Sequence, residues 1–247
     1  MATDSHSPLA QFEVYPIAGL EFQLMGYDIS FTNSALFMLL AVVASSFLMI
    51  VAMGRGSLVP NRWQNVAEMT YEFVANMLNE SVGPKGKEYF PFIFSIFMFI
   101  LLGNLLGMIP YSFTFTSHII VTFALAAMVF IVVTIIGLVK HGLHFFSLFM
   151  PSGVSYVLAP ILIPIEMLSY LSRPVSLSVR LFANMMAGHT MLKVFAGFSV
   201  TLGVVFGLAP MFINVALIGF EILVAVLQAY VFTILSCMYL KDSLELH

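Results

Sequence analysis

Arg180 carries a charge within an apolar run over residues 177–189. A guanidinium group keeps its proton wherever it lies in a protein. Such a charge costs between roughly 3 and more than 10 kcal/mol in hydrocarbon, and the residues that carry this cost usually mark ion paths. Arg180 therefore requires an anion, a polar lining or water beside it.

Further polar residues share a face with Arg180 if this stretch is helical. A helix turns by about 100° per residue, which places five polar side chains within roughly 80° of one another. They are Glu166, Arg173, Ser176, Arg180 and Asn184, whereas His189 and Lys193 lie on the opposite side. The sequence thus predicts a polar stripe on an otherwise apolar helix.

A second apolar stretch carries Asn214, Glu221 and Gln228, spaced seven residues apart and therefore aligned along one helix face. Taken singly, Ser176 and Asn214 are best interpreted as residues that hydrogen-bond neighbouring helices. The combination of an arginine, two glutamates and a histidine on two helices instead favours a proton path. We therefore include Ser176 and Asn214 in the predicted path.

The two stretches can form a hairpin with its turn near Val204. Arg180 then lies opposite Gln228, and His189 lies opposite Glu221. A histidine and a desolvated carboxyl group can exchange protons near neutral pH. Arg180 cannot pass a proton, so it would separate a region at Glu166 from one at His189 and Glu221. It would also attract a carboxylate from another chain and keep it ionised.

The amino-acid composition indicates whether these residues lie in water or in a membrane. The 247 residues are 61% hydrophobic and 9% charged, against about 25% charged in soluble domains, which indicates an integral membrane protein. The net charge of −3 and the lack of a basic cluster argue against nucleic acid binding. With one cysteine and no phosphate-loop or metal-binding motif, we expect no disulfide framework, no cofactor and no metal.

The apolar pattern predicts an all-α polytopic membrane protein. Its predicted parts are an external N-terminal segment at 1–33, a spanning helix at 34–53, an amphipathic surface helix at 61–82, two spanning helices within 90–139 (90–109 and 119–139) and a hairpin at 155–240. The hairpin helices, 155–196 and 204–240, would each measure about 55–60 Å, nearly twice the hydrocarbon thickness. We favour two steeply tilted helices over four short spans.

The basic residues orient the chain. They are absent from the N-terminal segment and the 110–117 loop, and they occur at Arg55, Arg62, Lys85, Lys87, Lys140 and Lys241. The positive-inside rule then puts the N-terminus outside and the C-terminus in the cytoplasm. The N-terminus lacks the basic start of a signal peptide, so the first span should be retained. We expect a bacterial inner membrane, although an organelle-encoded protein would look similar.

Residues 61–82 read as a helix along the cytoplasmic surface, with Asn61 as N-cap and Gly83-Pro84 as its end. Its acidic polar face favours contact with a neighbouring helix or subunit over anionic lipid.

Four other polar residues have simpler interpretations. Arg173 either extends towards the membrane surface or pairs with Glu166, and Lys193 extends to the surface as well. His118 is a turn residue or the edge of a proton entrance. Asn104 packs and hydrogen-bonds between helices.

Two segments carry a resemblance to a known family. SLSVRLFANMMAGH at 176–189 and NLLGMIPYS at 104–112 resemble subunit a of F-type ATP synthases, and the similarity extends over nearly the whole chain from about residue 30. The resemblance implies that Arg180 is the essential arginine, with Gln228 as its partner glutamine and Asn184 as the family asparagine. Ala183 departs from members that have glycine there.

The resemblance also implies two half-channels. Glu166 matches the acidic residue near the cytoplasmic one, and His189 with Glu221 matches the pair of the other, whose residue types are exchanged in some bacteria. Protons from outside would reach a carboxylate on a rotating ring of c subunits and leave past Glu166, while Arg180 blocks a direct leak. The implied partners are the c-ring, b-type peripheral-stalk subunits, the rest of the ATP synthase and the lipid bilayer.

Two other classes remain as alternatives. A secondary transporter also places charges near the membrane midplane, but it typically has inverted repeats, and none is detectable here. A structural scaffold subunit would tolerate replacement of Arg180.

Overall fold

The computed structural model of the chain describes most of the predicted elements. The described residues are 10–17, 23–24, 27–28, 30–53, 60–109, 112–142, 144–145 and 159–245. Arg55, Pro110, residues 155–158 and much of the predicted external segment 1–33 lie outside them.

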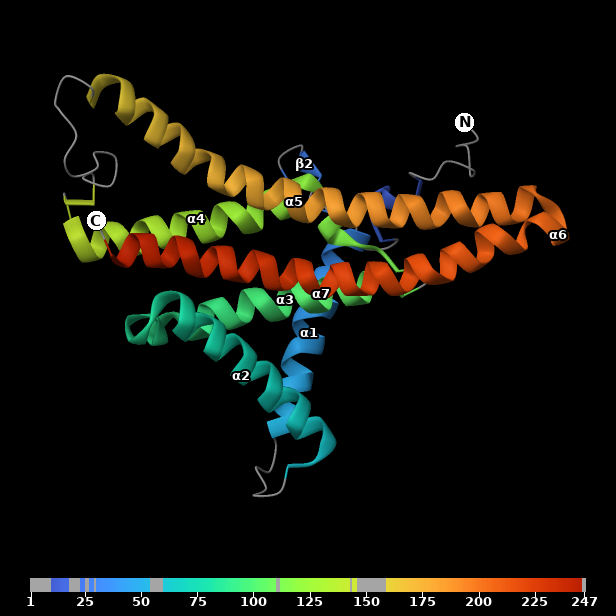
Figure 1. The fold of residues 1–247 in the computed structure, drawn as a ribbon, viewed down its shortest axis with the longest axis horizontal. Helices are drawn as coiled ribbons and strands as arrows, with labels where there is room; N and C mark the ends of the chain where they lie inside the picture. The colour runs from blue at the N-terminus through green and yellow to red at the C-terminus, as the bar shows by residue number, and fades with distance from the viewer. Residues whose placement is uncertain are drawn as a thin grey trace. The chain divides into compact units, whose positions relative to one another are not determined.

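The described part of the chain is almost entirely helical, which confirms the predicted all-α class (Figure 1). The longer elements are α1 (Asn33–Met53), α2 (Arg62–Val82), α3 (Phe90–Gly107), α4 (Ile119–His141), α5 (Ala159–Thr201) and α7 (Leu208–Leu244). The short ones are η1 (Ala10–Phe12), η2 (Pro84–Tyr89), η3 (Phe115–Ser117), α6 (Gly203–Phe206) and the antiparallel pair β1 (Gln23–Leu24) and β2 (Tyr27–Asp28).

Four of these helical segments are long and apolar enough to cross a membrane: α1, η2 with α3, α4 and α7. This agrees with the predicted polytopic membrane protein. The 43-residue helix α5 is not among them, because its charged and polar side chains lower its mean hydropathy. A helix of this kind is stable in a membrane only if its polar groups face protein or water.

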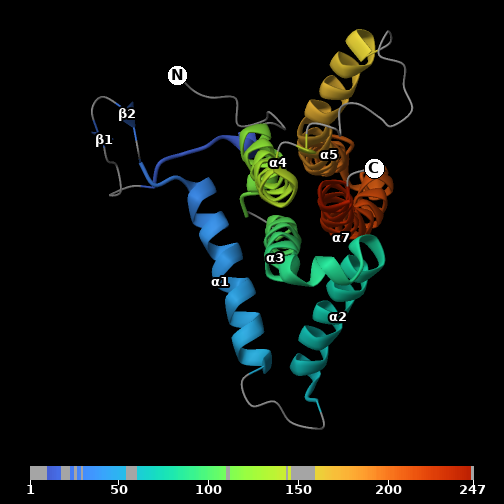
Figure 2. The same cartoon turned by 90° about the vertical axis from the view of Figure 1, so that its left-hand side faces the viewer.

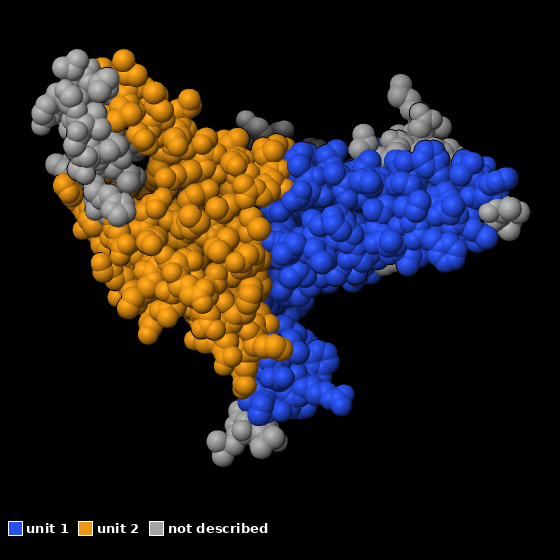
Figure 3. All heavy atoms as spheres, viewed as in Figure 1, with its two compact units in different colours: residues 1–67, 98–118, 181–229 blue, residues 68–97, 119–180, 230–247 orange. Residues whose placement is uncertain are grey.

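The chain forms two compact units, coloured separately in Figure 3. Unit 1 comprises residues 1–67, 98–118 and 181–229, and unit 2 comprises residues 68–97, 119–180 and 230–247. Each is described by itself below.

The core of unit 1 joins α3, η3 and α7 around Asn104. This side chain is fully buried. Its Nδ2 donates a hydrogen bond to the Ala225 carbonyl of α7 at 3.1 Å, and its Oδ1 accepts one from Thr116 Oγ1 at 2.8 Å. Buried polar groups are costly unless they are bonded, so this pattern explains a polar residue there and confirms its predicted interhelical role.

The predicted turn near Val204 falls in α6. Helix α5 ends at Thr201, and Gly203 adopts a φ of 73°. This left-handed conformation is unfavourable for residues that have a Cβ atom, and glycine has none. Helix α7 then starts at Leu208, with Pro210 in its first turn, where the missing N–H is tolerated. Within unit 1, the adjoining parts of α5 and α7 therefore run antiparallel (Figure 1).

In unit 2, α2 leads through η2 into α3 (Figure 2). Helix α2 ends at Val82, and Gly83 has a φ of 78°, so the chain turns at the predicted Gly83-Pro84. The two helices meet through aromatic side chains, with the Tyr71 and Phe90 rings 4.6 Å apart. The start of α2 belongs to unit 1, and there Asn61 Oδ1 accepts a hydrogen bond from the Arg62 backbone at 2.7 Å.

The part of α5 that belongs to unit 2 contains Pro164 and Pro174. A proline inside a helix removes one backbone hydrogen bond and usually produces a bend. Figure 1 shows α5 bending in this first half, and Pro174 is buried there.

The contact between α3 and η3 depends on a glycine. A Cβ atom on Gly103 would lie 2.3 Å from Phe115 Cζ, and Phe115 is only 1% exposed. We expect Gly103→Ala to destabilise the detergent-solubilised chain by about 1–3 kcal/mol, the usual cost of overpacking a core. Thermal unfolding measures this. Gly219→Ala is the control, because no atom lies within 4 Å of its added methyl; equal stability of the two variants would contradict the packing argument.

Candidate functional site

The centre of the site is a histidine–glutamate pair between α5 and α7 in unit 1. His189 Nδ1 lies 3.1 Å from Glu221 Oε1, and Glu221 is only 4% exposed. The two residues therefore lie opposite each other, as the predicted hairpin register requires. Neither oxygen of the Glu221 carboxyl group accepts a hydrogen bond from a described residue. The carboxyl group thus lies within ion-pair distance of the imidazole but is not locked by other donors.

This close approach is possible because residue 188 is a glycine. A Cβ atom on Gly188 would lie 2.6 Å from Glu221 Oε1 and 2.9 Å from Cδ. The carboxyl group of α7 therefore rests against the backbone of α5. Its position beside His189 follows directly from the absence of a side chain at the preceding residue.

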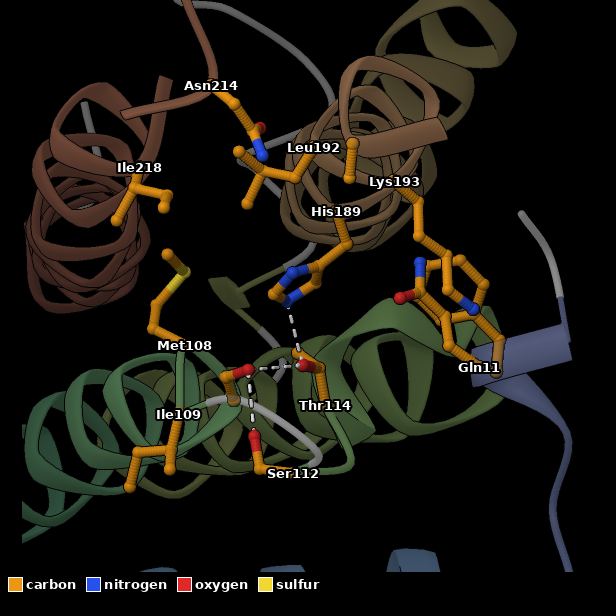
Figure 4. A pocket seen from close by; sticks show the side chains of 13 residues that line it. Gln11, Met108, Ile109, Ser112, Thr114, His189, Leu192, Lys193, Asn214 and Ile218 are labelled. Carbon is orange, nitrogen blue, oxygen red and sulfur yellow. Dashed lines mark hydrogen bonds between the residues drawn. The ribbon is translucent and has the colours of Figure 1, made fainter. Parts of the chain in front are cut away.

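The other side of the imidazole contacts the segment that follows α3 (Figure 4). Thr114 Oγ1 lies 2.8 Å from His189 Nε2 and 3.2 Å from the Gly107 carbonyl oxygen. Ser112 Oγ donates to the same carbonyl at 2.9 Å. Two hydroxyl groups and the end of α3 therefore fix the Nε2 edge of the ring.

A cavity of about 540 Å³ opens beside the pair within unit 1. Its polar lining includes Gln11, Thr114, His189, Lys193 and Asn214 (Figure 4). Asn214 Oδ1 is buried and has no hydrogen-bond partner among the described residues. A cavity of this size has room for several water molecules, and its polar side chains can bond them, which gives Asn214 and the histidine a route to water.

A second polar contact of unit 1 joins Asn184 and Gln228. Asn184 Nδ2 donates to Gln228 Oε1 at 2.8 Å, and Gln228 is 3% exposed. The Gln228 Nε2 atom is buried and lacks a partner among the described residues. The Gln228 amide nitrogen therefore has an N–H group for which the described residues supply no acceptor.

Arg180, in unit 2, lies on an open face of α5. The arginine and Ser176 are both exposed, and so are Val175 (49%) and Val179 (43%). The residues that the structure describes form no salt bridge with Arg180. The charge thus sits among exposed apolar side chains without an acidic partner from the described chain.

Of the two interpretations of Arg173, the pairing with Glu166 is wrong. Arg173 Nη1 lies 2.9 Å from Asp242 Oδ2, and its guanidinium lies 5.2 Å from the ring centres of Tyr170 and Tyr239. Asp242 and Tyr239 of α7 and Tyr170 of α5 therefore satisfy this cation within unit 2. Glu166 is half-buried and forms no salt bridge among the described residues.

His118 packs in the segment between α3 and α4. Its ring stacks on Phe113 with centroids 5.1 Å apart, and burial lowers the pKa of the imidazole below its usual 6.5. The ring is therefore neutral at neutral pH, which fits the turn-residue interpretation better than a charged entrance.

Sequence reasoning missed Ser112, Thr114 and Gly188, which support the pair, and Asp242, which pairs with Arg173. Two of them had a usable signal, because hydroxyl side chains in an uncharged loop directly after a span can reach the neighbouring helix. Gly188 and Asp242 had none, since the need for a close approach or for a partner of Arg173 appears only in three dimensions.

Comparisons with known proteins agree with the earlier resemblance. The sequence profile of the ATP synthase A chain family matches residues 35–241. ATP synthase subunit a of Pelagibacter ubique is 58% identical over 247 residues, covering all of both chains. ATP synthase subunit a of Rhodospirillum rubrum is 55% identical over 242 residues, which is 98% of this chain and all of the relative.

The contact at Gly188 gives a structural prediction. In Gly188→Ala the new methyl group must push the Glu221 carboxyl group away, so the distance between His189 Nδ1 and Glu221 Oε1 should exceed 3.1 Å. An experimental structure of the variant measures this distance. Gly197→Ala on the same helix is the control, because its methyl meets no atom within 4 Å. An unchanged distance in Gly188→Ala would show that the glycine does not set the contact.

Proposed function

Because this chain belongs to the ATP synthase A chain family, we propose that it is the proton-conducting stator subunit of an F-type ATP synthase, with two offset half-channels separated by Arg180. The observation that carries the proposal is the buried histidine–glutamate pair of unit 1 with its adjoining cavity. In unit 2, the exposed Arg180 on an apolar helix face, without a salt bridge among the described residues, supports it.

The outer half-channel begins at the cavity of unit 1. Water there delivers a proton to His189 and Glu221, which lie 3.1 Å apart. Imidazole and a desolvated carboxyl group can both change protonation near neutral pH. The proton then passes to a carboxylate on a c subunit. Asn214 lines the entry with a buried amide oxygen that water can bind.

Arg180 acts as the charge gate. Its exposed guanidinium attracts the c-subunit carboxylate and keeps it ionised, because a neighbouring cation favours the charged form of an acid. Arginine cannot release a proton itself, so the two half-channels stay separate. Asn184, four residues after Arg180, is exposed and adds polar surface, while its Nδ2 donates to the buried Gln228 Oε1 at 2.8 Å.

The cytoplasmic half-channel runs past Ser176 and Glu166. Both lie on the predicted polar stripe of α5, and neither is fully buried. Once Arg180 has forced the carboxylate to ionise, its proton leaves along this side. The net result is one-way rotation of the c-ring coupled to proton flow, with ATP made elsewhere in the complex.

The localisation, orientation and partners of the chain follow from the proposed function. The chain works in a bacterial inner membrane with its N-terminus outside and its C-terminus in the cytoplasm. It binds the c-ring through the open face of α5 and α7 and contacts b-type peripheral-stalk subunits. We expect ATP to be bound and made by other subunits of the complex, and the described residues contain no cluster of metal ligands.

Replacing the gate tests the proposal directly. Arg180→Ala should abolish proton-driven ATP synthesis in vesicles that contain the assembled complex, because the carboxylate loses the cation that makes it ionise. Arg62→Ala is the matched control, since Arg62 is an exposed residue at the start of the surface helix α2. Retained synthesis in Arg180→Ala would refute the gate and favour a scaffold subunit.

Replacing the buried acid tests the outer half-channel. Glu221→Gln should slow proton uptake by about tenfold or more, because a positioned acid or base typically contributes at least about 100-fold and water replaces only part of it. Passive proton flux into vesicles measures this, with subunit content checked by gel. Glu80→Gln on the exposed side of α2 is the control. Normal flux in Glu221→Gln would remove this residue from the path.

A further inference from the structure

The hydrogen bonds around Thr114 limit where its single hydroxyl proton can point. The Gly107 carbonyl oxygen lies 3.2 Å from Thr114 Oγ1 and can only accept. The His189 Nε2 atom lies 2.8 Å from the same hydroxyl and can donate or accept. If the hydroxyl proton points to the carbonyl, Nε2 must carry a proton and donate it to Thr114.

The opposite ring nitrogen then has a defined state. A neutral imidazole with hydrogen on Nε2 has a bare Nδ1, and this atom lies 3.1 Å from Glu221 Oε1. The hydrogen bond at one ring nitrogen generally decides which tautomer is present. Thr114 is 5% exposed, so the bulk solvent does not compete strongly for its hydroxyl.

From this geometry we infer that Thr114 is a positioning residue: it holds His189 as the Nε2-protonated tautomer and leaves Nδ1 for proton exchange with Glu221. The inference rests on the proposed outer half-channel and adds the residue that orients it. A second proton taken up by the ring binds at Nδ1. Its transfer to the Glu221 carboxylate leaves a neutral imidazole and a carboxylic acid, so the Nε2–H bond stays intact throughout.

The surroundings of His189 leave this role to Thr114. Among the described residues, the charged or titratable groups near the ring are Glu221 on α7 and Lys193 on α5, which lines the same cavity. Glu221 lies at Nδ1, and Lys193 extends towards Gln11 in Figure 4. The Gly107 carbonyl also accepts from Ser112 Oγ at 2.9 Å, and its two lone pairs accommodate both hydroxyl groups.

The tautomer can be measured in the resting complex, without transport. The ¹⁵N spectrum of histidine-labelled complex, assigned by the signals that disappear in His189→Gln, should show a protonated Nε2 and a bare Nδ1 in the neutral ring. Thr114→Val, which keeps the shape but lacks the hydroxyl, should lose this preference, whereas Thr114→Ser should retain it. A neutral ring protonated at Nδ1, or an unchanged spectrum in Thr114→Val, would overturn the inference.

Transport gives the second measurement. Thr114→Val should lower proton flux by about fivefold, the change that corresponds to one typical hydrogen bond, and should alter its dependence on pH. Thr114→Ser should restore both. Thr190→Val is the matched control, because among the described residues Thr190 bonds the Met186 carbonyl of its own helix and no other group.

The proposed function and the positioning role of Thr114 can fail separately. If Arg180→Ala and Glu221→Gln leave transport intact, the proposed function fails, and the nitrogen spectrum still decides the tautomer. If those variants behave as expected and Thr114→Val retains normal flux and pH dependence, the positioning role is overturned. Should Thr114→Val assemble poorly, Thr114→Ala supplies the same loss of the hydroxyl in a smaller side chain.

Discussion

The close contact of α5 and α7 at Gly188 determines the polar arrangement of unit 1. A carboxyl group on one membrane helix can reach the backbone of another only where no side chain intervenes, and Gly188 provides that place for Glu221. His189 is the next residue, so the place where Gly188 admits the carboxyl group is also the place where the titratable groups of the two helices meet. Small residues commonly allow such approaches in membranes.

The rest of unit 1 supports both members of this pair from one short segment. Thr114 contacts the imidazole, and Thr116, two residues later, bonds Asn104. Asn104 in turn holds the Ala225 carbonyl, one helical turn beyond Glu221. Backbone and side-chain polar groups within a membrane need partners in the protein. The same hydrogen bonds that satisfy them therefore also fix the position of His189 beside Glu221.

The sequence predicted the parts of this arrangement that periodicity controls. A long hairpin with its turn near Val204 places His189 opposite Glu221, and the structure has the two atoms 3.1 Å apart. It did not predict that Arg173 pairs with Asp242, because helical spacing identifies neighbours on one helix and leaves the choice among helices open. Thr114 was missed for a related reason: it lies in an irregular segment whose path no periodic pattern describes.

The contrast between the two arginines of α5 explains why only one can be a gate. Arg173 has an acidic partner and two aromatic rings, so its charge is already balanced within unit 2. Arg180 is exposed beside exposed valines and forms no salt bridge among the described residues. Lipid tails cannot balance that charge, and in the proposed function the c-subunit carboxylate balances it. Because arginine never gives up its proton, the proposal assigns the gain and loss of charge to that carboxylate.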